Sequence, residues 1–289
     1  MAHSSLPRLM IEPAVRAALV EDLGLAGDIT STAVIPADHH STMIMASRRQ
    51  GVIAGLDAAQ LAFELIDPAI VMTRHLEDGA AVQPGETIAT IEGPSRGLLT
   101  AERTALNLLS HLSGIATVTA GIVAAIQNTN ASVVCTRKTT PGLRALEKYA
   151  VRAGGGINHR FGLCDAVLIK DNHIAIAGGV AEAIRRAKAA VGHMVKIEVE
   201  VDRLDQLREA MAVGTDAILL DNMTPDELRE AVGIVAGRAI TEASGGITPT
   251  TAAAVAACGV DLLSSGWITH SAPTLDIGLD FAGIGHSRR

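Results

Sequence analysis

The chain has 289 residues and a formal net charge of −7, and 48 % of its residues are apolar but only 2 % aromatic. This length allows one large domain or two ordinary ones with an ample aliphatic core. The acidity excludes a face for a long polyanion, and the scarcity of aromatic residues excludes a base-stacking platform for single-stranded nucleic acid. Cys135, Cys164 and Cys258 form no close pair, which excludes a CxxC metal knuckle and suits a reducing cytoplasm.

The first hundred residues predict a β-rich, structural domain. A helical apolar pattern covers residues 14–23, with Pro13 in the first turn, and another covers 56–66. Strands are predicted at 42–47 and 70–75. The following glycine- and proline-rich hairpins resemble biotinyl and lipoyl carrier modules, but such modules present a lysine at their turn. No lysine precedes Lys138, so a carrier module is not predicted.

Residues 104–126 carry no charged side chain and could be taken for a membrane span. They contain polar residues and glycines that lipid would tolerate poorly, so we expect buried helices in a soluble protein. Thr100 is predicted to cap the helix, which places Arg103 in the first turn, against the helix dipole. This position indicates that Arg103 faces a ligand anion.

From Val133 onward, short apolar runs alternate with helical patterns. This alternation predicts βα units and a parallel sheet closed into an incomplete barrel. The chain lacks the GxGxxG loop that would favour a doubly wound open sheet. Six strands are predicted, near Val133, Val167, Val195, Ile218, Ala239 and Leu262.

The segment 136–173 carries seven basic residues against three acidic ones. A local excess of cations in an acidic chain predicts a pocket for a small, highly charged anion. Two histidines of the segment, His159 and His173, add donors. Some of these cations directly follow an apolar strand or lie in the glycine-rich loop between two strands. We predict that they bind the ligand; they are Arg137, Lys138, Arg160 and Lys170. The cations spaced four apart are predicted to form the solvated stripe of a helix, with Glu147 as a partner for the first: Arg144, Lys148 and Arg152.

Two carboxylates at strand ends, Glu200 and Asp221, are the next candidates. Strict alternation in 195–201 aims Lys196, Glu198 and Glu200 into the barrel. Lys196 could pair with Glu198 as a purely structural bridge, whereas Glu200, nearest the mouth, is the better functional candidate. Together with Asp221 it could hold Mg²⁺ or the hydroxyls of a ribose.

Glycine-rich turns follow the last two predicted strands, at Ser244-Gly245-Gly246 and Ser265-Gly266. Backbone N–H groups in such turns form phosphate sites, and barrels often hold phosphate after their final strands. The residues alone therefore predict a cytoplasmic barrel enzyme that acts on a small, multiply anionic, phosphorylated molecule.

The motifs TRKTTPGLR, EKYAV, GGGxNHRxGLxDxxLIKDNH, LLDNM, ASGGI and SSGWITHS together resemble quinolinate phosphoribosyltransferase, from Glu21 to Asp276. The resemblance implies an open α/β barrel of the phosphoribosyltransferase type II kind with an N-terminal α/β sandwich domain. It implies a sandwich at 1–113, a barrel at 114–270, and a tail at 271–289 that returns to the sandwich.

The resemblance also implies the reaction. A carboxylating nicotinate-nucleotide diphosphorylase, which is a pentosyltransferase, joins quinolinate to phosphoribosyl pyrophosphate with Mg²⁺. It releases pyrophosphate and CO₂ and forms nicotinate mononucleotide for NAD biosynthesis. The family's subunits pair so that one sandwich closes the other subunit's barrel, which implies a homodimer or a higher oligomer with a shared site.

By the family pattern, Lys138, Lys170, Glu200 and Asp221 would be catalytic, the two acids on the ribose and metal side. The quinolinate ligands would be Arg103, Arg137, His159, Arg160 and Lys170. The remaining substrate-binding positions would be Thr136, Lys138, Ser244, Gly245, Gly246, Ser265, Gly266 and His270.

Two alternatives stay open at this point. Lys170 at a strand end could be the Schiff-base lysine of a barrel aldolase, because a desolvated lysine among cations has a lowered pKa. A paralogue associated with molybdenum uptake shares the family's fold.

Overall fold

The structure is a computed structural model that describes residues 5–282. The chain forms two compact units, which are described separately below. Among the described residues, the first unit comprises 5–118, 140–155 and 271–282, and the second comprises Thr119–Thr139 and Gly156–His270. The predicted boundaries at 113 and 270 stay a prediction, and the end of the predicted tail, 283–289, lies outside the described residues.

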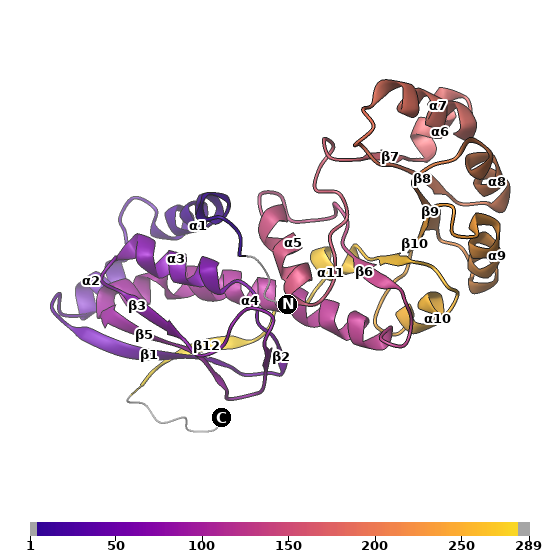
Figure 1. The fold of residues 1–289 in the computed structure, drawn as a ribbon. Coiled ribbons are helices and arrows are strands. Elements are labelled where there is room, and N and C mark those ends of the chain that lie inside the picture. Colours follow the sequence, from indigo (N-terminus) through magenta and orange to yellow (C-terminus); the bar gives the residue numbers. More distant parts are fainter. Residues whose placement is uncertain (1–4, 283–289) are drawn as a thin grey trace. The chain divides into compact units, whose positions relative to one another are not determined.

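An antiparallel sheet organises the first unit, with the strand order β12-β1-β5-β3 (Figure 1). The last strand comes from the far end of the chain, where Leu279 pairs with Met45. Apolar residues fill one face of the sheet, among them Met45 and Ile91, which are fully buried. The strands of this unit are β1 (His40–Ser47), β2 (Gly51–Val52), β3 (Val71–Arg74), β4 (Ala81–Val82), β5 (Thr87–Pro94) and β12 (Ile277–Phe281).

Three helices of the first unit precede the long α4. They are α1 (Arg8–Leu23), α2 (Ile29–Val34) and α3 (Leu56–Ile66). The predicted bounds of α3 are confirmed, but α1 begins before its predicted start, so Pro13 lies inside it. The cap of α2 is Asp28, whose carboxylate accepts the backbone N–H of Ser31 at 2.8 Å.

The charge-free stretch lies in one helix, α4 (Ser95–Ala125). By length and composition α4 could cross a membrane, but half of its most apolar window is buried inside the protein. The predicted cap at Thr100 is wrong, because the helix begins five residues earlier, directly after β5. Arg103 therefore lies two turns inside α4 with an exposed side chain, and the dipole argument for it does not hold.

The predicted solvated stripe lies on α5 (Arg144–Ala153), and for Lys148 the prediction is wrong. Both Lys148 and Glu147 are completely buried in the first unit. Glu147 accepts hydrogen bonds from His111 Nε2 at 2.8 Å and from the backbone N–H of Thr140 at 3.1 Å. The spacing predicted a helix correctly, but it could not show which face of that helix packs into the unit.

Six parallel strands organise the second unit, in the order β6-β11-β10-β9-β8-β7. The first and second strands in chain order stand at opposite edges of the sheet. Because these two edges do not pair with each other among the described residues, the barrel is open, as predicted. The strands are β6 (Ser132–Val134), β7 (Val167–Ile169), β8 (Ile197–Val201), β9 (Ala217–Asp221), β10 (Ile240–Ser244) and β11 (Leu262–Ser264).

Helices cover the outer face of this sheet (Figure 1). Each long helix buries one stripe of small and aliphatic residues three or four positions apart, such as Leu207, Ala210 and Met211 on α8. Because these helices cover the outer face, the inner face of the sheet and the carboxyl ends of its strands are left to form a site. The covering helices are α6 (Asp171–Ala177), α7 (Val180–Ala190), α8 (Leu204–Val213), α9 (Pro225–Val235) and α10 (Ala252–Ala256). The short α11 (Trp267–His270) follows β11 instead, and its Trp267 and His270 line the cavity described below.

Candidate active site

A cavity of about 730 Å³ opens at the carboxyl ends of the six parallel strands. Its lining brings together all of the predicted site residues except Arg103. They are Thr136, Arg137, Lys138, His159, Arg160, Lys170, Glu200, Asp221, Ser244, Gly245, Gly246, Ser265, Gly266 and His270. The second unit thus gathers residues that are up to 134 positions apart in sequence into one site.

Strand register places the polar side chains in layers. Asp221 and Ser244 are register partners on β9 and β10, and Ser244 is in turn the partner of Ser264 on β11. One layer deeper, Glu200 and Glu242 flank Leu219 in register. Because side chains of a strand alternate between its faces, residues two apart point into the same cavity at different depths.

The cationic side of the cavity comes from two loops. Arg137 and Lys138 follow β6, and their side chains make no hydrogen bond or ion pair with another residue between 5 and 282. The guanidinium of Arg160 donates from Nη1 to the carbonyl of Ala166 at 3.0 Å, while its buried Nε has no partner. Burial, together with the nearby charge of Arg137, lowers the pKa of Arg160. Guanidinium groups with unpaired N–H donors are suited to carboxylates, which accept two parallel hydrogen bonds from them.

The two predicted carboxylates have different partners. Glu200 forms an ion pair with Lys170. Asp221 accepts a hydrogen bond from the Asn222 side chain at 2.8 Å. Two oxygen-rich side chains at strand ends fit Mg²⁺, which is commonly bound by one or two carboxylates plus waters and substrate phosphates. The set therefore fits the predicted cation, with most of the coordination left to the substrate.

The two glycine-rich turns pack closely against neighbouring side chains, so a residue with a Cβ would clash at Gly245 and at Gly266. Gly245 has φ +103°, and a Cβ there would lie 2.1 Å from the side-chain oxygen of Asn222. A Cβ on Gly266 would lie 2.7 Å from Cδ of Lys138. The turns also hold each other, since the Ser265 hydroxyl donates to the carbonyl of Ile247 at 2.9 Å. Exposed N–H groups of such turns suit a phosphate.

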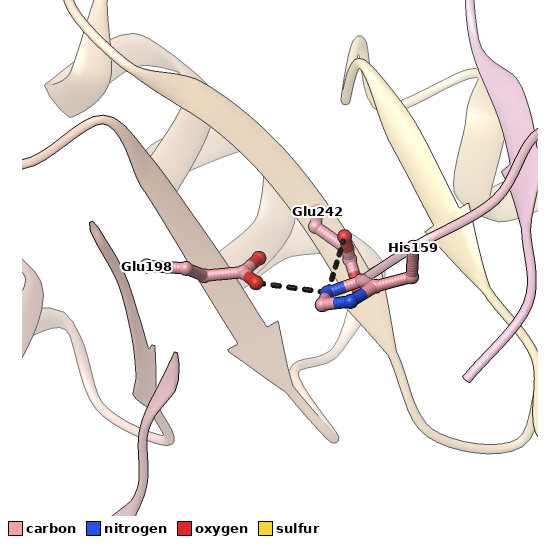
Figure 2. Close-up of side chains that lie close together, drawn as sticks. All are labelled: His159, Glu198 and Glu242. Carbon is pink, nitrogen blue, oxygen red and sulfur yellow. Dashed lines mark hydrogen bonds and ion pairs between the residues drawn. The ribbon is translucent and has the colours of Figure 1, made fainter. Parts of the chain in front are cut away.

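Below these residues lies a buried group that spans the barrel, formed by His159, Glu198 and Glu242 (Figure 2). The His159 ring donates from Nε2 to Glu198 at 2.8 Å and lies 3.6 Å from a Glu242 oxygen. Burial and the charge of Glu198 raise the pKa of Glu242 to about 7. Nδ1 of the same ring accepts the backbone N–H of Arg160 at 2.7 Å. Both ring nitrogens of His159 therefore have hydrogen-bond partners within the second unit.

The sequence prediction missed Glu242 and misassigned Glu198. Lys196 pairs with Asp216 at 2.7 Å on the exposed rim, so the predicted bridge between Lys196 and Glu198 is wrong. β8 begins after Lys196, which leaves that lysine outside the barrel's inner face. Glu242 could have been found by the alternation argument, because it lies two residues before Ser244 on β10.

Arg103 belongs to the first unit and is not among the residues that line the cavity. It lines a separate hollow of about 410 Å³ on α4 and the segment before β12. The other residues that line this hollow are Leu106, Asn107, Ser110, Thr274, Leu275, Asp276 and Ile277.

Comparison with known proteins covers nearly the whole chain. Residues 28–113 match the family model of the N-terminal domain of quinolinate phosphoribosyl transferase, and residues 115–280 match that of its C-terminal domain. The chain is 49 % identical to the carboxylating nicotinate-nucleotide pyrophosphorylase of Mycobacterium leprae, over 92 % of this chain and 95 % of that protein. It is 37 % identical to a mitochondrial, decarboxylating quinolinate phosphoribosyltransferase of Nicotiana tabacum, over 94 % of this chain and 82 % of that protein.

Solved structures agree. The nicotinate-nucleotide pyrophosphorylase of Francisella tularensis superposes with a TM-score of 0.92 at 38 % identity, covering 97 % of this chain and 99 % of that one. NadC from Streptococcus pyogenes gives a TM-score of 0.92 at 41 % identity, covering 96 % and 99 %. With both domain models matched and these identities over most of its length, the chain belongs to the quinolinate phosphoribosyltransferase family.

Proposed function

We infer that the protein is a carboxylating nicotinate-nucleotide pyrophosphorylase, which transfers a phosphoribosyl group to quinolinate in NAD biosynthesis. The observation that carries this function is a single cavity whose lining combines two arginines, two strand-end carboxylates and two glycine-rich turns. This activity leaves no role for a Schiff base at Lys170, and neither alternative from the sequence is retained.

We place quinolinate at the cationic wall. Arg160 offers an unpaired, buried Nε, and Arg137 beside it carries a charge with no partner among residues 5–282. A dicarboxylate would pair both guanidinium groups, which relieves their mutual repulsion. Lys170, at the end of β7, would reach the same ligand once its contact with Glu200 loosens.

Phosphoribosyl pyrophosphate would occupy the opposite side. We propose that Glu200 and Asp221 hold the ribose hydroxyls and the Mg²⁺ ion, and that Lys138 contacts the pyrophosphate. The bound Mg²⁺ would neutralise charge that develops on the departing pyrophosphate. The positions proposed around the 5′-phosphate are Ser244, Gly245, Gly246, Ser265, Gly266 and His270, with Thr136 beside Lys138.

The reaction needs alignment more than it needs an acid or a base. The quinolinate nitrogen forms a bond to C1 of the ribose while the bond from C1 to pyrophosphate breaks, so positive charge builds on the sugar. Cations at the leaving group and carboxylates near the ribose match that charge distribution. Loss of CO₂ then leaves its electron pair on the ring carbon beside the pyridinium nitrogen, and that carbon takes up a proton.

We further propose that the chain works as a homodimer or higher oligomer in the cytoplasm. Arg103 supports the oligomer, because the family pattern makes it a quinolinate ligand although it lines a different hollow from the cavity. A neighbouring subunit could supply it reciprocally across a two-fold axis. Cys135 and Cys258 are buried and form no disulfide bond with another described residue, which suits a reducing compartment. The predicted domains, 1–113 and 114–270, would then be the cap and the barrel of that assembly.

The activity is tested by incubating the purified protein with quinolinate, phosphoribosyl pyrophosphate and Mg²⁺. Nicotinate mononucleotide, pyrophosphate and CO₂ should form in equal amounts. Lys138→Ala should abolish the reaction, whereas the surface change Glu77→Gln should not alter it. A wild-type protein that makes no nucleotide from these substrates would rule the function out.

A further inference from the structure

Thr269 carries a buried hydroxyl that the reaction described above does not use. It lies on α11, just after the turn of Ser265 and Gly266, and it is 2 % exposed. Its side chain is not among those that line the cavity. A buried hydroxyl needs a hydrogen-bond partner, and this one finds its partner in the backbone of the loop after β6.

The bond joins two segments of the second unit that are far apart in sequence. The hydroxyl of Thr269 donates to the carbonyl oxygen of Lys138 at 2.7 Å, across 131 positions of the chain. The carbonyl oxygen of Gly266 lies farther from the same hydroxyl, at 3.1 Å. Because a hydroxyl has only one proton, the shorter contact is the one in which it acts as the donor.

The loop that carries Lys138 lies outside the regular structure. β6 ends at Val134, and no helix or strand follows before α5 begins at Arg144. Within the loop, the hydroxyl of Thr136 accepts the backbone N–H of Lys138 at 3.0 Å. With the bond from Thr269, both backbone polar groups of Lys138 are held, which fixes the direction in which its side chain leaves the loop.

The side chain of Lys138 lies directly over the second glycine-rich turn. A Cβ on Gly266 would be only 2.7 Å from Cδ of Lys138 and 3.4 Å from the hydroxyl oxygen of Thr136. The turn is itself held to the end of β6, because the backbone N–H of Ser265 donates to the carbonyl of Val134 at 3.1 Å. The lysine and the turn therefore form one surface of the cavity.

Phosphoribosyl pyrophosphate carries anionic groups at two separate points, a phosphate on C5 and a pyrophosphate on C1 of the ribose. A site for it must hold a cation and a phosphate-binding turn at a fixed separation. We propose that Thr269 is a positioning residue, whose hydroxyl fixes Lys138 over Gly266 so that the ammonium group meets the pyrophosphate while the turn holds the 5′-phosphate. The inference rests on the proposed function for the identity of the substrate.

Paired substitutions separate the hydroxyl from the bulk of the side chain. Thr269→Val keeps the shape but leaves the carbonyl of Lys138 facing a methyl group, so the loop gains by turning that carbonyl towards water. We expect kcat to fall at least about tenfold, with an unchanged KM for quinolinate. Thr269→Ser keeps the hydroxyl and should have a kcat close to that of the wild type, although the lost methyl group lowers the Tm.

The control is Thr241→Val. Thr241 is also buried, and its hydroxyl donates to Asp261 at 2.7 Å near the start of β10, away from the residues that line the cavity. Its loss should lower the Tm and leave kcat unchanged. A kcat that follows the Tm of the variants, instead of the presence of a hydroxyl at position 269, would overturn the proposal. If Thr269→Val does not fold, Thr269→Ala against Thr269→Ser makes the same comparison.

Binding of inorganic pyrophosphate, measured by calorimetry with Mg²⁺ present, tests whether Thr269 acts through Lys138. Thr269→Val should bind pyrophosphate about tenfold more weakly than the wild type. In a Lys138→Ala background the same substitution should cause no further loss, because the side chain that it positions is gone. Equal losses in the two backgrounds would show that Thr269 acts elsewhere and would refute the proposal.

The outcomes separate this inference from the proposed function. A wild type that makes no nucleotide, but in which pyrophosphate binding depends on Thr269 only when Lys138 is present, refutes the function and leaves the positioning of Lys138 standing. An active wild type in which Thr269→Val changes neither kcat nor pyrophosphate binding refutes the inference alone. A wild type that binds no pyrophosphate refutes the place given to Lys138 and the inference with it.

Discussion

The ionisation of Glu242 should make the free energy of unfolding fall as the pH rises, and the substitution Glu242→Gln should remove this pH dependence. Burial raises its pKa from an ordinary 4.5 to about 7. Below the unfolded pKa the carboxyl is protonated in both states. As the pH rises towards the folded pKa, the unfolded chain ionises while the folded chain keeps its proton, so the folded state loses stability.

The size of the effect follows from the shift. A raise from 4.5 to about 7 corresponds to about 3 kcal/mol, at roughly 1.4 kcal/mol for each pKa unit. Glu242 is 1 % exposed, so solvent screening does not reduce this figure greatly. Between about pH 4 and about pH 8, the wild type should therefore lose about 3 kcal/mol relative to Glu242→Gln, which cannot ionise.

The assay is chemical denaturation of both proteins at matched concentration across this pH range. Only the change in their difference with pH matters, because constant effects of the substitution cancel. The control is Glu77→Gln, an exposed glutamate in the same chain, whose difference from the wild type should not vary by more than a few tenths of a kcal/mol. Parallel profiles for wild type and Glu242→Gln would refute the raised pKa of Glu242.

Three further predictions concern the cavity and the oligomer. In Gly245→Ala the new Cβ would lie 2.1 Å from the side-chain oxygen of Asn222, so this variant should raise the KM for phosphoribosyl pyrophosphate at least tenfold. The control is Gly237→Ala, which has a similarly positive φ but open space around it and should leave that KM unchanged. Equal KM values for the two variants would contradict the assignment of Gly245 to the phosphate. Asp221→Asn should impair the use of phosphoribosyl pyrophosphate but leave quinolinate binding, measured by calorimetry, intact. Loss of quinolinate binding in this variant would contradict the proposed division of the site. Glu200→Ala tests the division less directly, because it also removes the ion-pair partner of Lys170. Arg103→Ala and Lys138→Ala should each be nearly inactive, yet mixing them should restore about one quarter of wild-type activity, since about half the dimers are mixed and each has one intact site. No recovery despite demonstrated subunit exchange would place Arg103 in its own subunit's site.

Much of the second unit could be predicted from sequence, because its signals are local. Six apolar runs marked six strands, and the polar residues that end them, such as Lys170 and Asp221, do line one cavity. The carboxyl ends of parallel strands meet at one edge, so a list of strand ends already approximates a site.

The errors arose where packing, not periodicity, decides the outcome. Lys148 has the spacing of a solvated stripe but is buried, because α5 packs into the first unit. Thr100 resembles a cap, but α4 begins at Ser95, where β5 runs directly into it. Glu242 was missed although it lies two residues before Ser244, because β10 carries few aliphatic residues and only its spacing from Ser244 marks the side that faces the cavity.

The central claim is that this cavity recognises a dicarboxylate, and comparing quinolinate with nicotinate tests it most directly. Nicotinate has one carboxylate and would leave one cation of the Arg137 and Arg160 wall unpaired, at a cost of about 3 kcal/mol or more. We predict that kcat/KM for nicotinate, measured with phosphoribosyl pyrophosphate and Mg²⁺, falls at least about 100-fold below that for quinolinate. Comparable values for the two acids would contradict the account.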